Sequence, residues 1–142
     1  MIVVDANVLI YAYNSSAEQH ESARAWLERT ITQQGTIAVP WSVIHAFLRL
    51  TTGTRVMPTP LSIDDAIAIV EEWLDSGAFR VIEPGAGYWT ILRALLRESQ
   101  TRGNVIMDAH IAALAIENDA AVCTTDRDFA RFANVRVIDP LR

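Results

Sequence analysis

Apolar residues along this chain fall into two alternating patterns, short unbroken runs and longer stretches with helical spacing. The unbroken runs predict short strands buried on both faces, at residues 2–4, 37–39, 79–82, 121–123 and 135–138. Elsewhere apolar residues recur every three or four positions, which predicts helices at residues 6–13, 20–32, 41–52, 63–76, 88–102, 107–118 and 126–132. Strands separated by helices predict an α/β fold, a three-layer α/β/α sandwich with a central parallel sheet of about five short strands.

Residues that begin and end helices agree with this pattern. Ser62, followed by Asp65 three residues later, is typical of a capped helix start, and Gly77 and Gly103 stand at expected helix ends. Residues 53–61 contain one glycine and two prolines and predict a loop. No low-complexity segment or linker divides the chain, so we expect a single domain over residues 1–142.

Composition narrows the classes of protein. The 142 residues are 51% hydrophobic and 20% charged, which excludes intrinsic disorder. Asp5 interrupts the N-terminal apolar run, and no basic segment precedes it, so we expect neither a signal peptide nor a membrane span. The single cysteine, Cys123, excludes a disulfide framework and fits a reducing cytoplasm.

Charge adds two constraints. The net charge of −5 argues against a protein that coats nucleic acid through bulk positive potential. All 12 basic residues are arginines, so any mechanism that requires a lysine is excluded. Phosphate binding would fall to arginine, whose guanidinium forms forked hydrogen bonds.

Three aspartates occupy positions where chemistry is expected in a parallel sheet. Asp5 follows the first predicted strand, Asp126 follows the fourth, and Asp108 opens the apolar helix before the fourth. Ligands bind α/β sheets beyond the carboxyl ends of the strands, so these carboxylates are expected to converge there. Clustered carboxylates stay ionised only with a cation, and oxygen ligands with room for water suit Mg²⁺ or Mn²⁺. Such an ion can activate water and hold a phosphodiester for in-line attack.

Other interpretations of these aspartates exist. Aspartate is a favoured helix N-cap, and each of the three stands near a predicted helix start. Haloacid-dehalogenase-like phosphatases and receiver domains also place an aspartate after the first strand. The phosphatases need a second aspartate where this chain has Asn7, and both classes normally rely on a lysine. The residues therefore disfavour both enzyme classes and leave capping as the main alternative.

Three short motifs resemble the signature of PIN-domain ribonucleases. The motif DAN follows the first strand at residues 5–7. The pair DA stands at residues 108–109, at the start of an apolar helix, with RGN shortly before it. The motif TTDRDF follows the next strand at residues 124–129. The size and the order of the motifs resemble, more narrowly, the VapC-type toxins of bacterial type II toxin–antitoxin pairs. The resemblance covers essentially the whole chain.

The resemblance implies an Mg²⁺- or Mn²⁺-dependent endoribonuclease that cuts structured RNA, such as tRNA or rRNA. It also implies a cognate VapB-type antitoxin and a homodimer. By position, Asp5, Asp108 and Asp126 would be the catalytic, metal-holding carboxylates, and Asn7 and Thr125 would orient them by hydrogen bonds. Asp128 has two interpretations, a further member of the acidic cluster or a charge that stabilises its own short helix.

The chain departs from the family pattern at one position. Such toxins commonly carry a glutamate on the helix after the second strand, where this chain has His45 and Ala46. Ser42, His45 and Arg49 share one face of that helix, so Arg49 could hold a phosphate and His45 could assist; the alternative is an ordinary, partly buried histidine. The missing glutamate also motivates a second function, a weakened module that binds RNA or antitoxin without efficient cleavage. A third possibility is an enzyme acting on DNA or nucleotide phosphates.

The remaining aromatic and histidine residues are expected to be architectural. The tryptophans stand at apolar helical positions and are expected in the core or in a dimer interface, at residues 26, 41, 73 and 89. His20 and His110 are expected to be structural or surface residues.

Overall fold

A parallel sheet of five strands forms the centre of the molecule in this computed structural model, which describes residues 1–33 and 35–142. The strand order is β3-β2-β1-β4-β5, and every pair of neighbours is parallel. The strands are β1 (Ile2–Val4), β2 (Ile37–Pro40), β3 (Phe79–Ile82), β4 (Ala121–Cys123) and β5 (Val137–Ile138). Val3 and Val4 in the central strand are fully buried, as expected for a strand covered on both faces.

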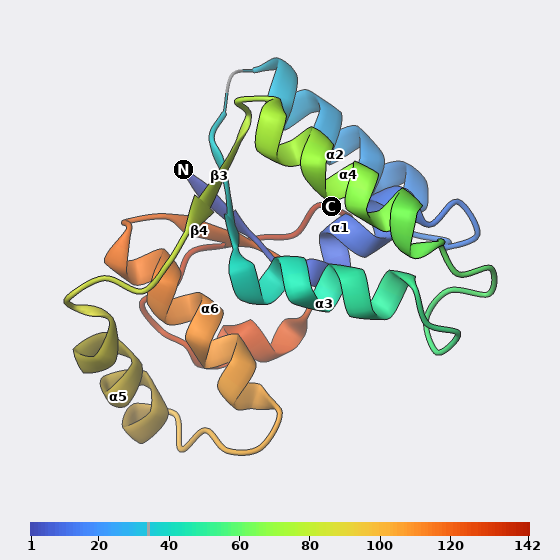
Figure 1. The fold of residues 1–142 in the computed structure, drawn as a ribbon. Helices are drawn as coiled ribbons and strands as arrows, with labels where there is room; N and C mark the ends of the chain where they lie inside the picture. The colour runs from blue at the N-terminus through green and yellow to red at the C-terminus, as the bar shows by residue number, and fades with distance from the viewer. Residues whose placement is uncertain (34) are drawn as a thin grey trace.

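Helices cover both faces of the sheet, and the three-layer sandwich expected from the sequence is confirmed (Figure 1). Right-handed crossovers place the helices between β1 and β3 on one face and those between β3 and β5 on the other. The first set is α1 (Ala6–Tyr13), α2 (His20–Thr32), α3 (Trp41–Thr51) and α4 (Ile63–Asp75). The second set is α5 (Tyr88–Glu98), α6 (Val105–Glu117) and the 3₁₀ helix η1 (Arg127–Arg131).

An aromatic cluster joins three helices to the sheet. The Trp73 ring stacks on Phe79, with ring centroids 5.5 Å apart, and meets Phe47 edge-on at 4.7 Å. Its indole N–H donates to the hydroxyl of Tyr13 at 3.0 Å, so the buried polar atom has a partner. Trp26 and Trp73 lie in the core as predicted, whereas Trp41 and Trp89 are 42% and 61% exposed.

Two element ends differ from the sequence expectation. Helix α5 ends at Glu98 rather than near Gly103, because Gln100 adopts a left-handed conformation (φ 50°) and the Thr101 N–H donates to the Leu96 carbonyl. Helix α6 begins at Val105, two residues earlier than expected, after Gly103 turns the chain with a φ of 68°. As a result, Asp108 lies inside the first turn of α6 instead of at its N-cap.

Smaller features complete the fold. Helix α3 ends at Thr51, one residue earlier than expected, β2 extends to Pro40, and β5 starts only at Val137. Residues 53–61 form the expected loop, although its Met57 is buried in the core. Among the described residues, no helix is long and apolar enough to cross a membrane.

Candidate active site

The carboxyl ends of the two central strands carry a hydrogen-bonded polar network. Asp5 follows β1 and Thr124 follows the neighbouring β4, so their side chains meet at one edge of the sheet. The Thr124 hydroxyl donates to Asp5 Oδ2 at 2.7 Å, and the Asn7 amide donates to the same oxygen at 3.2 Å. Asp5 Oδ1 accepts from the Ala6 N–H at 2.8 Å, which makes Asp5 the N-cap of α1. The network holds a carboxylate that is only 8% exposed.

The sequence predicted that Thr125 would orient the carboxylates by a hydrogen bond, but the hydroxyl that contacts Asp5 belongs to Thr124. Thr124 is buried, and its oxygen also accepts from the Asp126 N–H at 3.0 Å. Thr125 reaches the network through its backbone N–H, which donates to Asn7 Oδ1 at 3.3 Å. The sequence shows two adjacent threonines, and only the direction of the chain after β4 decides which hydroxyl turns inward.

A second group of carboxylates faces this network. Asp108 on α6 lies with Asp126 and Asp128, and each offers one oxygen such that all three oxygens lie within 4.8 Å of one another. Asp5 stands outside this group of three, but its charge contributes to raising the pKa of Asp108. The structure thus brings Asp108, Asp126 and Asp128 together and places Asp5 near enough for its charge to act on Asp108.

Burial and mutual repulsion perturb these carboxyl groups. Burial, together with the charges of Asp126, Asp5 and Asp128, raises the pKa of Asp108 to about 7. Burial is also the main cause that raises the pKa of Asp5, and the hydrogen bond from Thr124 opposes it. Without a cation, Asp108 is therefore partly protonated at neutral pH.

This donor set fits a hard divalent cation. Among the described residues, no hydrogen-bond donor reaches the Asp108 carboxylate, although it lies beside other negative charges. A divalent ion would supply the missing positive charge, and ligands made only of carboxylate oxygens suit Mg²⁺ or Mn²⁺.

Capping and clustering coexist at this site. Asp5 and Asp126 cap α1 and η1, and Asp126 Oδ1 accepts from the Asp128 N–H at 2.8 Å. Asp108 caps no helix. Asp128 contributes to the group of three, and it also lies 3.7 Å from the guanidinium of Arg131 in an exposed pair. Capping therefore explains two of the aspartates in part and Asp108 not at all.

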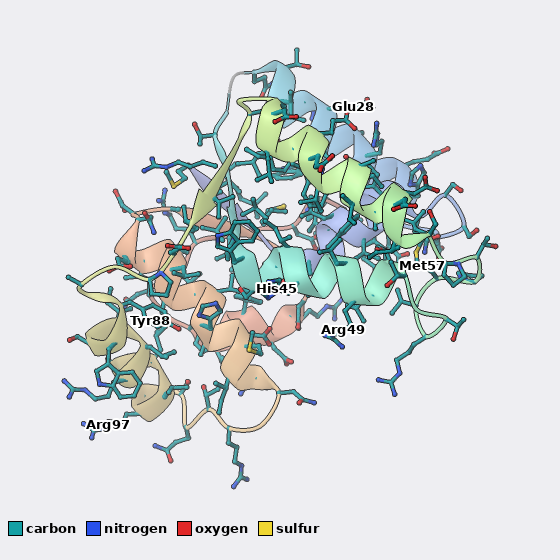
Figure 2. The ribbon with its side chains drawn as sticks, viewed as in Figure 1. Glu28, His45, Arg49, Met57, Tyr88 and Arg97 are labelled. Carbon is teal, nitrogen blue, oxygen red and sulfur yellow. The ribbon has the colours of Figure 1, made fainter. Side chains whose placement is uncertain are left out.

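The residues proposed on α3 are not members of the group of close carboxylates. His45 and Arg49 are on the exposed side of α3 (Figure 2). His45 is exposed rather than partly buried, and its ring lies 6.5 Å from that of Trp41. Within the described part of the chain, the group of close carboxylates receives no member from α3, so the position of the family's glutamate stays without an acid.

His110 has a larger structural role than its sequence position indicates. Its Nε2 lies 3.0 Å from the Ser42 hydroxyl, and its Nδ1 is bonded to the hydroxyl of Tyr88. Burial lowers the pKa of His110, which favours the neutral ring. The histidine therefore joins α3, α5 and α6. Its partners are 68 and 22 residues away in the chain, so no local sequence signal could have found them.

The fold and the site together define a class: an α/β protein with a carboxylate centre suited to a divalent cation at the carboxyl edge of its parallel sheet. Residues 2–135 of the chain match the family model described as "PIN domain". The chain is 37% identical to Ribonuclease VapC33 of Mycobacterium tuberculosis, over 100% of this chain and 99% of that protein. The chain belongs to the PIN-domain family and, within it, to the VapC ribonucleases.

Solved structures share the fold. VapBC-1 from nontypeable Haemophilus influenzae aligns with a TM-score of 0.71 at 18% identity and covers 100% of both chains. VapC20 of Mycobacterium tuberculosis, described as a toxin that cleaves the sarcin-ricin loop, aligns with a TM-score of 0.67 at 19% identity, over 96% of this chain and 99% of that one. At these identities the similarity shows the fold alone.

Proposed function

We propose that this protein is a metal-dependent endoribonuclease and the toxin of a toxin–antitoxin pair. The observation that carries the proposal is the group of three carboxylates, with Asp108 raised in pKa to about 7 by burial and by its acidic neighbours. A bound Mg²⁺ or Mn²⁺ would neutralise these charges, activate water and hold the phosphodiester for attack.

We assign separate roles to the side chains of the site. Asp108 and Asp126 would hold the ion together with Asp5, and Asp128 would complete the acidic set. Thr124 and Asn7 fix the orientation of the Asp5 carboxylate through hydrogen bonds of 2.7 and 3.2 Å. Arg49, exposed on α3, would bind a phosphate of the RNA, and His45 would assist beside it.

Similarity to proteins of the family supports a proposal for the substrate and the partners. We propose a structured RNA, a tRNA or rRNA, because a relative of the same fold is described as cleaving the sarcin-ricin loop. We further propose a VapB-type antitoxin as the inhibitor, a homodimer as the active assembly and the cytoplasm as the location. Related solved structures are toxin–antitoxin complexes, and the lone Cys123 fits a reducing compartment.

Cleavage of total bacterial RNA tests the proposal. The purified protein is incubated with RNA and Mn²⁺, Mg²⁺ or EDTA, beside Asp5→Asn and a matched control, Asp75→Asn, which removes an exposed carboxylate on α4. We expect discrete products with metal, none with EDTA and none from Asp5→Asn, while the control cleaves like the wild type. Intact RNA that is still bound by the wild-type protein would instead indicate a module that binds without cutting.

A further inference from the structure

A pocket lies at the same edge of the sheet as the carboxylates. It has a volume of about 390 Å³ and opens at the carboxyl ends of β2 and β3, where it is lined by Trp41, Ser42, His45, Glu83 and His110. None of these residues belongs to the group of close carboxylates. The pocket is large compared with a water molecule, which occupies about 30 Å³ in the liquid.

The sheet register places this pocket beside the candidate active site. Val3 of β1 pairs with Ala38 of β2, so Asp5 follows β1 at the level of Pro40. Pro40 pairs with Ile82 of β3, and Glu83 follows it. Because neighbouring strands lie about 4.8 Å apart, the backbone of Glu83 is roughly 10 Å from that of Asp5. A nucleic acid strand whose phosphate lies at Asp5 can therefore place the base of an adjacent nucleotide in this pocket.

The pocket offers the two features by which proteins bind an unpaired base. One is aromatic surface, the exposed indole of Trp41 with the His45 ring 6.5 Å from it. The other is a set of polar groups at the wall, the Glu83 carboxylate and the Ser42 hydroxyl. Single-stranded RNA is bound through stacking on such rings and hydrogen bonds to the Watson–Crick edge.

The polar wall is held in place before any ligand binds. Helix α6 anchors the segment after β3 at two points: Glu117 accepts from the N–H groups of Gly85 and Gly87 at 2.8 and 3.0 Å, and His110 binds Tyr88. A Cβ on Gly85 would lie 2.8 Å from Glu117 Oε2, so a larger residue there would displace the Glu117 carboxylate from its present position. Glu83 therefore projects from a fixed backbone, which lowers the entropic cost of binding.

We propose that this pocket binds an unpaired guanine of the RNA, next to the cleaved bond, by stacking on Trp41 and by hydrogen bonds to Glu83. An ionised carboxylate only accepts hydrogen bonds. Guanine alone carries two adjacent donors, N1–H and the N2 amino group, on its Watson–Crick edge, whereas adenine, cytosine and uracil place an acceptor beside the donor. The inference rests on the proposed function for its cleaved bond, but base binding can be measured without cleavage.

Binding of short oligoribonucleotides tests the assignment. Fluorescence anisotropy is measured for UUGUU, UUAUU, UUCUU and UUUUU with the Asp5→Asn variant, which keeps the oligonucleotides intact. We expect UUGUU to bind about tenfold more tightly than the others. Adding Glu83→Gln abolishes the preference, because the glutamine amide brings a donor toward a donor edge. Glu71→Gln, which changes an exposed glutamate on α4, leaves it unchanged. Trp41→Ala weakens binding of all four sequences.

The outcomes separate the two proposals. Equal affinity for the four sequences, absence of binding, or a guanine preference that survives Glu83→Gln overturns the pocket assignment. Mapping the products of the wild-type enzyme on RNA adds the second readout, a guanosine at one fixed position beside each cleaved bond. If the wild type fails to cut RNA while the guanine preference and its loss in Glu83→Gln persist, the proposed nuclease function fails and the pocket assignment stands.

Discussion

Burial and three neighbouring carboxylates all raise the pKa of Asp108, and the charge of Arg131 opposes them. The pKa of Asp108 rises to about 7 in the folded protein, from an ordinary value of 3.8. Between about pH 4 and pH 7 the folded chain therefore keeps a proton that the unfolded chain has lost. The metal-free protein loses stability as the pH rises through this window, and the loss is complete above pH 7.

The raised pKa of Asp108 predicts how Asp108→Asn changes stability, since this substitution removes the charge at nearly constant volume. In EDTA at pH 8 we expect the variant to be about 1–2 kcal/mol more stable than the wild type, a value discounted for the partial exposure of the group. This corresponds to a Tm higher by roughly 3–6 °C. Thermal melts at pH 8 and pH 4 measure it, since the difference should vanish at pH 4. Mn²⁺ should raise the Tm of the wild type and not that of the variant; equal responses would contradict the assigned role.

Thr124 predicts a second effect at the residue scale. Thr124→Val keeps the shape but removes the hydroxyl that donates to Asp5 at 2.7 Å. We expect cleavage to fall by about 10–100-fold, as is typical when a partner of a metal-holding carboxylate is lost. The pKa of Asp5 should rise further, so the acidic limb of the pH–rate profile should move to higher pH. Thr124→Ser should restore both.

Thr125→Val is the matched control for that experiment. Within the described residues, Thr125 contributes its backbone N–H to the network and no hydroxyl contact. Its variant should keep nearly full activity and an unchanged pH profile. A loss as large as that of Thr124→Val would contradict the assignment of a specific role to the hydroxyl in contact with Asp5.

At the scale of elements, sequence patterns predicted what the strands and helices are better than where they end. The run after Asp5 predicted α1 with its observed bounds, because buried apolar positions and a capping aspartate agree there. The end of α5 could not be predicted, since a left-handed glutamine replaces the expected glycine stop. The same local geometry decides that Asp108 stands in the first turn of α6 and not at its cap.

The two left-handed residues at this connection predict opposite effects of substitution. Gln100→Gly should stabilise the protein by roughly 0.5–1 kcal/mol, because glycine adopts a φ of 50° without a Cβ clash. Gly103→Ala should destabilise it by a similar or larger amount, since its φ is 68°. Urea unfolding of both variants measures the change, and a Gln100→Gly variant less stable than the wild type would show that the hydrogen bond from Gln100 to the Arg97 carbonyl matters more than the strained backbone.

At the scale of the whole molecule, the net charge of −5 means that RNA is attracted only locally, by individual arginines. Binding of single-stranded RNA should therefore weaken only modestly with salt. If Arg49 contacts a phosphate, Arg49→Gln should reduce the slope of log K against log[salt] by about 0.7. Arg29→Gln, on the exposed side of α2, should leave the slope unchanged. Anisotropy titrations at several salt concentrations give these slopes, and an unchanged slope in Arg49→Gln would remove that arginine from the interface.

The architecture could be predicted because buried parallel strands and their crossover helices have distinct periodicities, and the aspartates because parallel strands end at a common edge. Contacts between distant segments could not be predicted. Glu117 binding the backbone at Gly85, and His110 binding Ser42 and Tyr88, depend on side-chain directions that no local pattern encodes. The choice between Thr124 and Thr125 depended on the same kind of information.

The position of β1 in the middle of the sheet has a consequence during translation. Strand β1 pairs with β2 on one side, but on its other side it pairs with β4, whose residues are made more than 110 positions later. Asp5 meets Thr124 and Asp126 only when that late segment has emerged and docked. A nascent or truncated chain that lacks β4 thus carries Asp5 without the Thr124 hydroxyl that helps to orient it. For the ribonuclease proposed above, the site is therefore assembled only after β4 has been made.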